Sequence, residues 1–262
     1  MTDKKLILIT GCNKGIGYTL VEDLIKQGLN INIIFTARND NLGLASLNKL
    51  ISKYPNCKSQ LFYHQLDITN KESILSIINW IKQKFQKIDV LFNNAGVYNT
   101  TREQVIQTNV FGTFTITEMF LQNDVINNNG KIISVGSSMG SFSSAGNHKS
   151  ELKNAKTVNE LYNLANRYLK ENWGGGAYSI SKLLIHLFAE VLGNYEEIKR
   201  KNIGVYSMDP GWCRTDMGGR GAPLPPEHGA SIGTFLIKLP YGINPKLQGK
   251  YFNSPYPQPA TY

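Results

Sequence analysis

Short apolar runs alternate with longer segments of helical periodicity along most of this chain, and that alternation constrains the fold more than any other feature. The apolar runs have the length of buried strands, and they lie at residues 6–9, 31–36, 61–66, 90–92, 132–135 and 203–207. Segments with helical spacing lie between them, at residues 18–27, 72–85, 110–126 and 178–195. Strands of this kind are typical of a parallel sheet that helices cover on both faces. Right-handed crossovers then predict an α/β fold with a doubly wound sheet.

The 262 residues show no internal repeat and no linker rich in proline or serine, so we expect a single domain over residues 1–262. Two stretches interrupt the alternation. Residues 141–173 are polar and are interpreted as an insertion, with a helix expected at residues 158–170. Residues 213–228 contain several glycines and prolines and are expected to form an irregular, mobile substrate loop over a site.

Charge and cysteine usage exclude several classes of protein. The net charge is +9, but the densest basic run is only residues 199–201, so we expect no nucleic-acid partner. No apolar run is long enough for a bilayer span, and no membrane association is expected. Cys12, Cys57 and Cys213 form no C-x-x-C pair, which indicates free thiols and a cytoplasmic location.

A glycine-rich turn joins the first strand to the first helix at residues 10–17 (TGCNKGIG). Gly11 permits a tight turn, Gly15 lets the backbone approach a pyrophosphate, and Gly17 lets the helix pack closely on the sheet. The helix N-terminus offers free N–H groups to the phosphates. The pattern therefore predicts a dinucleotide site, and the contacts expected from this turn are Gly11, Asn13, Lys14, Gly15, Ile16 and Gly17.

The end of the second strand indicates which dinucleotide binds. NAD-binding proteins usually place a carboxylate here for the ribose 2′-hydroxyl, whereas this chain has Arg38. A guanidinium pairs with a 2′-phosphate that a carboxylate would repel. Lys14 adds a second cation and Asn13 a hydrogen-bonding group, while Asp40 is the rival for a ribose hydroxyl. The residues favour NADP(H).

Tyr178 and Lys182 are four residues apart in a helical segment and share one face of it. A nearby ammonium is expected to lower the phenol pKa and make Tyr178 a general acid for a carbonyl oxygen. Ser137 follows the fifth strand, at the edge where open α/β sheets bind ligands, and Asn109 is expected to begin the helix after the fourth strand. His186, one turn beyond Lys182, is interpreted as a packed or exposed helix histidine, and the four dispersed histidines predict no metal site.

Together these residues resemble the short-chain dehydrogenases/reductases, over residues 6 to about 219. The motifs that carry the resemblance are T-G-x-x-x-G-x-G at 10–17, Asp67-Ile68 after the third strand, N-N-A-G at 93–96, Asn109, Ser137, Y-x-x-x-K at 178–182 and Pro210-Gly211. Residues 10–17, 36–38 and 210–217 are more narrowly similar to the cytosolic monomeric carbonyl reductases, as is the long interval before Tyr178. The resemblance implies a Rossmann sheet of seven mostly parallel strands.

The resemblance also implies roles for the residues of the site. Tyr178 would donate the proton, and Lys182 would bind the nicotinamide ribose and tune Tyr178. Ser137 would hydrogen-bond the substrate carbonyl, with Ser138 as the alternative because the usual Ser-Ser reads Gly-Ser-Ser here. Asn109 would hold a water in a relay to Lys182. The remaining cofactor contacts implied are Asp67 and Ile68 at the adenine, Asn93 at its ribose, Ala95 and Gly96 beside the groove, and Pro210, Gly211 and Thr215 at the nicotinamide end.

The expected substrate is a small carbonyl compound. Candidate walls of its pocket are Tyr98, Met139, Phe142, Trp212 and Met217, and the substrate contacts expected are Ser137, Met139, Tyr178 and Trp212. Such an apolar cavity suits aldehydes, ketones or quinones, reduced with NADPH. The alternatives are a dedicated alcohol, steroid, pteridine or lipid substrate, or a non-catalytic nucleotide sensor on the same fold. The insertion implies, by the resemblance, a monomer.

Overall fold

A computed structural model describes residues 4–171, 173–255 and 259–262. Among these residues seven strands form one sheet in the order β3-β2-β1-β4-β5-β6-β7, and all neighbouring strands are parallel. The strands are β1 (Leu6–Ile9), β2 (Asn32–Ala37), β3 (Gln60–Gln65), β4 (Ile88–Asn93), β5 (Ile126–Val135), β6 (Gly204–Met208) and β7 (Tyr251–Phe252). The strand order reverses between β1 and β4, and sheets of this kind bind ligands at the carboxyl ends of the strands there. The predicted doubly wound fold is confirmed.

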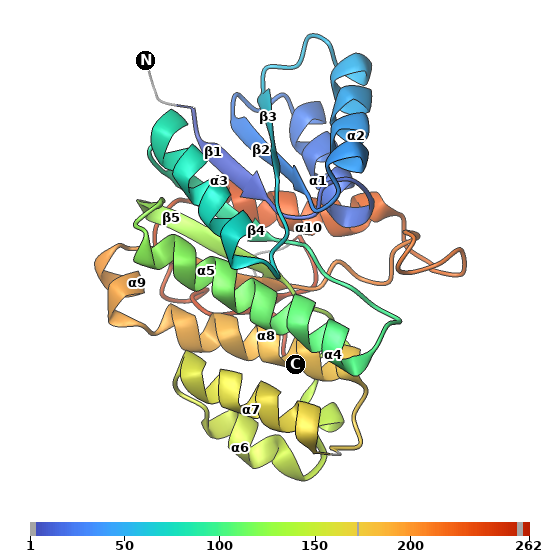
Figure 1. Ribbon diagram of the computed structural model, residues 1–262, viewed down its shortest axis with the longest axis vertical. Coiled ribbons are helices and arrows are strands. Elements are labelled where there is room, and N and C mark those ends of the chain that lie inside the picture. Colours follow the sequence, from blue (N-terminus) through green and yellow to red (C-terminus); the bar gives the residue numbers. More distant parts are fainter. Residues whose placement is uncertain (1–3, 172, 256–258) are drawn as a thin grey trace.

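Helices cover both faces of the sheet (Figure 1). One face carries α1 (Gly15–Lys26), α2 (Asp40–Lys53) and α10 (Pro226–Lys238), and the other carries α3 (Lys71–Lys84), α5 (Thr113–Gln122) and α8 (Ala177–Gly193). A separate apolar core fills each interlayer space. In β1, Ile7 and Ile9 belong to the core under α1, while Leu6 and Leu8 belong to the core under α3. This division explains why a strand buried on both faces contains apolar residues at every position.

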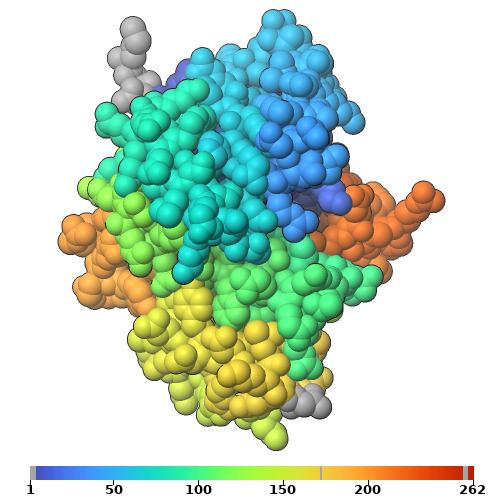
Figure 2. Space-filling view, in the orientation of Figure 1, coloured from blue at the N-terminus to red at the C-terminus, as the bar shows by residue number. Residues whose placement is uncertain are grey.

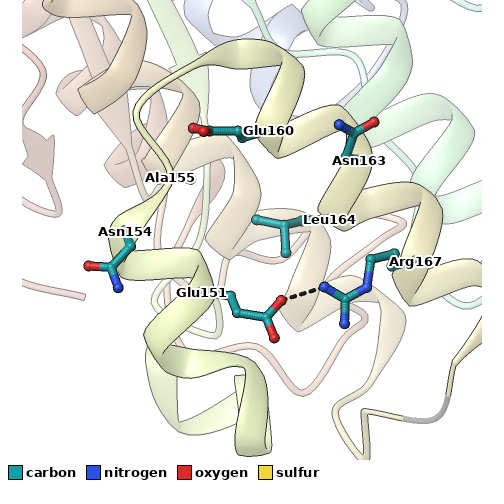
Figure 3. Close-up of a pocket in the computed structure, with 7 residues that line it drawn as sticks. All are labelled: Glu151, Asn154, Ala155, Glu160, Asn163, Leu164 and Arg167. Carbon is teal, nitrogen blue, oxygen red and sulfur yellow. Dashed lines mark hydrogen bonds and ion pairs between the residues drawn. The ribbon is translucent and has the colours of Figure 1, made fainter.

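The polar insertion before α8 contains a 3₁₀ segment (Phe142–His148) and two α-helices, α6 (Lys149–Asn154) and α7 (Val158–Lys170). The bounds of α7 are those predicted for it. Thr157 and Glu160 form a reciprocal capping box at the start of α7. Between α6 and α7 lies a shallow hollow of about 280 Å³, beside an ion pair of Glu151 with Arg167 (Figure 3).

The outer layer of the molecule is formed by α7. Figure 1 shows this helix lying outside α8, on the side away from the sheet. Tyr162 of α7 stacks on Phe111 at 5.7 Å between ring centroids and meets Phe114 edge-on at 5.2 Å. The insertion therefore buries an apolar surface that the α5 and α8 layer would otherwise expose.

The helix predicted for residues 110–126 is wrong at both ends. Helical structure begins earlier, with α4 (Arg102–Val105) and a π-helical turn (Ile106–Gly112), so Asn109 lies inside it and does not begin it. α5 ends at Gln122, and residues 127–130, expected to end the helix, lie within β5. The pairing of β4 with β5 shifts register there, so the polar run bulges out of the ladder.

Several elements were not predicted, namely α2, α10, the short α9 (Glu196–Arg200) and the two-residue β7. The segment between β6 and α10 contains turns and one isolated bridge between Cys213 and Leu224, and it projects from the side of the molecule (Figure 2). Its last three residues, expected to be irregular, already belong to α10. None of the helices in the described ranges combines the length and apolar character that a bilayer crossing requires.

Candidate active site

The glycine turn forms a close-packed junction between β1, α1 and the end of β4. Gly11 and Gly15 adopt left-handed backbone conformations, with φ of 69° and 60°. A Cβ on Gly17 would lie 2.5 Å from both the Asn94 amide nitrogen and the Gly11 carbonyl oxygen, so only glycine fits there. Lys14 caps α1 without a side-chain hydrogen bond, which leaves backbone N–H groups of the first turn directed at the groove.

The two asparagines that follow β4 have different surroundings. Asn94, which was not predicted as a site residue, donates from Nδ2 to the carbonyls of Thr10 and Gly11 at 2.8 and 2.9 Å and so holds the glycine turn. Asn93, expected at a ribose, is buried and donates to Thr117 Oγ1 at 3.0 Å. Its side chain therefore points into the core under α5, where its buried Oδ1 has no hydrogen-bond partner among the described residues.

The remaining residues of this junction are tightly packed. A Cβ on Gly11 would approach Ala95 Cα to 3.0 Å, and one on Gly96 would approach Asn109 Oδ1 to 3.1 Å. Asn13 accepts a hydrogen bond from Ser46 through its backbone carbonyl, at 2.8 Å. Ile16 packs toward α10, where a Cβ on Gly229 would meet its side chain. These residues shape the floor and one side of a groove along the strand ends.

The expected adenosine end of this groove carries one free cation. Arg38 is exposed directly after β2, and no carboxylate pairs with its guanidinium within the described ranges. Asp67 accepts hydrogen bonds from the Thr69 backbone and hydroxyl at 2.9 and 2.7 Å, while Ile68 is buried beside a small hollow. Lys14 was predicted near the same phosphate, but its ammonium instead pairs with Asp216 at 2.8 Å.

Tyr178 and Lys182 lie on the first two turns of α8, with the Lys182 nitrogen 5.4 Å from the centre of the phenol ring. Lys182 is buried and donates to the Val135 carbonyl at 2.7 Å. The Ser137 hydroxyl lies near enough to Tyr178 to lower the phenol pKa and accepts from the Met139 N–H at 3.2 Å, whereas Ser138 is exposed. The structure therefore brings Ser137, Tyr178 and Lys182 together at the carboxyl end of β5.

The expected lowering of the Tyr178 pKa is wrong for this structure. Burial raises the pKa of the phenol to about 12, the charge of Asp209 raises it too, and the hydrogen bond with Ser137 only partly opposes them. Burial also lowers the pKa of Lys182 to about 8, although Asp209 favours the ammonium. The phenol stays protonated because desolvation and the negative charge of Asp209 outweigh the influence of Ser137.

Asn109 joins the segment after β4 to α8. Its Oδ1 accepts from the Val97 N–H at 2.8 Å, and its Nδ2 donates to the Val97 carbonyl at 3.0 Å and to Ser181 Oγ at 3.1 Å. It lies in the π-helical turn, a local distortion that is frequent at functional sites. Its side-chain amide is thus engaged by groups of the protein itself, and the water relay stays a prediction.

Exposed apolar side chains surround the phenol. Met139 is 51% exposed and Trp212 60%, and the Tyr98 ring meets Tyr178 edge-on at 4.8 Å. Met217 is also exposed, but Phe142, expected in this wall, stacks on Tyr262 instead. The wall is open to solvent and carries few charges, which suits an apolar substrate.

The turn after β6 closes the far side of the groove. Gly211 adopts φ of 76°, Pro210 packs against α10, and the Thr215 hydroxyl accepts from the Gly218 N–H at 3.1 Å. A Cβ on Gly15 would lie 3.7 Å from Thr215, so this turn faces the glycine turn. Asp209 is buried at the base of this turn and was not predicted as a site residue. In the sequence, its position directly after a buried strand was the one feature that could have indicated it.

Of the two alternatives that the sequence left open for His186, a packed or an exposed helix histidine, the structure shows the packed one. It is fully buried on α8, and both ring nitrogens have hydrogen-bond partners. In the described part of the chain no group of three or more histidine, cysteine, aspartate or glutamate side chains is arranged to hold a metal ion.

Residues 5–149 match the profile of the family described as short chain dehydrogenase. This is more than half of the 262 residues, and the chain belongs to that family. Among individual proteins, it is similar to carbonyl reductase [NADPH] 1 of Rattus norvegicus, with 29% identity over 92% of this chain and 93% of that protein. It is also similar to (+)-neomenthol dehydrogenase of Arabidopsis thaliana, with 27% identity over 91% of this chain and 93% of that protein. The fold matches salutaridine reductase from Papaver somniferum with a TM-score of 0.81, at 23% identity over 95% of this chain and 99% of that one.

Proposed function

We propose that this oxidoreductase uses NADPH to reduce aldehydes, ketones or quinones to alcohols. The observation that carries the proposal is the half-buried Tyr178 phenol, with Ser137 and Lys182 beside it, under an exposed apolar wall. A relative named carbonyl reductase [NADPH] 1 supports the same substrate class and cofactor.

The residues present fit a dinucleotide. Because Gly11 and Gly15 have no Cβ atom, no side chain of theirs blocks the start of α1. The free N–H groups of that first turn suit a pyrophosphate. Arg38 has no acidic partner in the described ranges and would pair with a 2′-phosphate. When bound, NADPH supplies the hydride.

The side chains of the site would handle the proton. Ser137 and Tyr178 both direct hydroxyl groups to the position of a substrate oxygen, so they polarise and orient a carbonyl group. As the carbonyl carbon gains the hydride, Tyr178 gives its proton to the oxygen, and one alcohol forms. Lys182, buried next to the phenol, stabilises the negative charge that develops on Tyr178.

The test is a screen of NADPH oxidation over aromatic aldehydes, ketones and quinones, run in parallel with NADH. We expect turnover of several of these compounds with NADPH, and a weaker response with NADH. No turnover of any compound, together with tight NADPH binding, would instead favour a dedicated substrate. The similarity to a protein named (+)-neomenthol dehydrogenase makes a cyclic alcohol the second candidate. Biological activity that survives loss of the Tyr178 hydroxyl would favour a non-catalytic nucleotide sensor.

The pH dependence of turnover reports the charge on Lys182. Its lowered pKa, about 8, means that the ammonium is present below that pH and is lost as the pH rises through it. Tyr178, with a pKa of about 12, remains a proton donor over the same range. We therefore expect kcat/KM for carbonyl reduction to fall above about pH 8.

The matched control is Lys182→Arg, because a guanidinium stays charged throughout this range. We expect this variant to have a lower plateau and no fall near pH 8. A wild-type profile that stays flat well above that pH, or an identical fall in both proteins, would contradict the assignment to Lys182.

We also propose a cytoplasmic monomer. All three cysteines are unpaired, as is usual in a reducing compartment. The contacts of Tyr162 with Phe111 and Phe114 show α7 covering a face that could otherwise pair with a second copy. Light scattering coupled to size exclusion should give the mass of one chain, and a stable tetramer would refute the monomer.

A further inference from the structure

A set of buried hydrogen bonds lies directly behind Ser137. The imidazole of His186 contacts the Ser137 carbonyl oxygen through Nε2 at 2.9 Å and Ser207 Oγ through Nδ1 at 2.9 Å. His186 lies one turn beyond Lys182 on the buried side of α8, and its side chain is fully buried. None of these contacts has a part in the proton transfer described above.

The partners define the tautomer of the ring. His186 Nε2 lies 2.9 Å from the Ser137 carbonyl oxygen and 3.4 Å from the Ser137 backbone nitrogen. The contact with the oxygen is the shorter one and a carbonyl oxygen can only accept, so we assign the hydrogen to Nε2, which donates it to the Ser137 carbonyl. Nδ1 then bears a lone pair, which accepts from the Ser207 hydroxyl. Burial lowers the pKa of His186 to about 4, so the ring is neutral at physiological pH and keeps both hydrogen bonds.

Gly136 leaves space for the imidazole ring of His186. A Cβ on Gly136 would lie 2.1 Å from His186 Cε1, which no side chain could tolerate. The residue directly before Ser137 is thus glycine where the family motif has serine. Tyr251 meets the imidazole edge-on, with ring centroids 4.3 Å apart, and limits its movement.

Asp209 contacts the nitrogen end of the peptide group that joins Ser137 to Ser138. Its Oδ2 accepts from the Ser138 N–H at 3.0 Å, and its Oδ1 accepts from the Gly211 N–H at 2.9 Å. The Ser137 carbonyl and the Ser138 N–H belong to one planar peptide unit. That plane is therefore held at its oxygen by His186 and the Gly140 N–H, and at its nitrogen by Asp209.

We propose that His186, together with Asp209, is a positioning residue that fixes the Ser137–Ser138 peptide plane and so directs the Ser137 hydroxyl toward Tyr178. The proposal rests on the proposed carbonyl reduction. It assigns His186 no contact with substrate or cofactor, and His186 acts only through Ser137. Loss of its N–H would leave the Ser137 carbonyl with one donor, the Gly140 N–H at 2.8 Å, so the peptide plane would be held less tightly.

The test compares two substitutions at His186. His186→Leu removes the donor, and we expect kcat to fall about 10-fold with NADPH affinity unchanged. His186→Gln can place an N–H near the position of Nε2, and we expect it to recover most of the lost kcat. His148→Leu is the matched control, since it removes a histidine of the insertion, and it should leave kcat unchanged. Equal losses in the Leu and Gln variants would overturn the proposal.

A double-mutant cycle with Ser137→Ala separates positioning from a general effect on structure. If His186 acts through the Ser137 hydroxyl, His186→Leu should cause little further loss of kcat in the Ser137→Ala background. A loss of the same factor in both backgrounds would refute the proposal. Should His186→Leu fail to fold, Ser207→Ala, which removes only the partner of Nδ1, should show a smaller loss with the same non-additivity.

A measurement without turnover distinguishes this proposal from the proposed function. Long-range ¹H–¹⁵N spectra of the histidine rings should show His186 as the neutral Nε2–H tautomer. An inactive protein with this tautomer would refute carbonyl reduction, and with it the catalytic purpose of the positioning. The Nδ1–H tautomer or an imidazolium would refute the positioning contact itself, whatever the activity.

Discussion

Replacing Tyr178 with phenylalanine is expected to lower kcat/KM for carbonyl reduction by about 10²–10⁴-fold, which is the contribution of a well-placed proton donor. The substitution removes a single hydroxyl group. The ring keeps its place on α8 and its edge-on contact with Tyr98. Steady-state NADPH oxidation measures the loss, and fluorescence titration should show NADPH affinity unchanged.

Tyr98→Phe is the matched control, because it removes the same group from the neighbouring ring of the substrate wall. We expect an altered KM at most for this variant, with kcat close to that of the wild type. Turnover by Tyr178→Phe at the wild-type rate would show that Tyr178 is not the proton donor.

The second large effect is expected at Arg38. Arg38→Glu replaces a free guanidinium after β2 with a carboxylate that repels a 2′-phosphate and accepts from a ribose 2′-hydroxyl. Because a hydrogen bond to a charged group is worth about 1.5–3 kcal/mol, the KM for NADPH should rise roughly 10–100-fold. The KM for NADH should fall.

Arg200→Glu in α9 makes the same change in net charge before the start of β6, at the opposite edge of the sheet from the groove. We expect it to alter neither KM beyond a weak, salt-sensitive effect. If Arg38→Glu and Arg200→Glu changed the NADPH KM equally, the effect would come from net charge, and the assignment of Arg38 to the 2′-phosphate would be wrong.

Local sequence patterns were sufficient to predict the buried strands, helix α7 and the glycine turn. The apolar run at residues 6–9 predicts a buried strand because both faces of the strand contact a core, so every position is apolar. Residues 158–170 have a strongly one-sided apolar face and a capping box, so α7 is set by its own residues. The glycine turn is similarly local, since the positive φ of Gly11 and Gly15 is a property of each residue.

The errors in the predicted elements and contacts occur where residues distant in sequence determine the local structure. Residues 127–130 have the composition of a helix stop, but β4 pairs on both sides of them, so they become a bulge. Asn93 and Asn94 are neighbours with the same side chain. Because successive side chains of an extended chain point to opposite faces, Asn93 contacts the core and Asn94 contacts the glycine turn.

The properties of the site also depend on tertiary contacts. The spacing of Tyr178 and Lys182 places them on one face, but burial and Asp209, which follows β6, determine the direction of the phenol pKa shift. The same holds for His186, whose partners Ser137 and Ser207 come from the ends of two other strands. Helical spacing could identify neither.

The central claim is that Tyr178 completes the transfer of a hydride from NADPH to a carbonyl carbon, and isotope transfer tests it most directly. The protein is incubated with NADPH deuterated at its transferable position and with a ketone that the screen identifies, and the alcohol is analysed by mass spectrometry. The account predicts alcohol that carries the deuterium on its carbinol carbon, in equal amount to the NADP⁺ formed, and none above background with Tyr178→Phe. Unlabelled alcohol, or NADPH consumed without any alcohol, would contradict it.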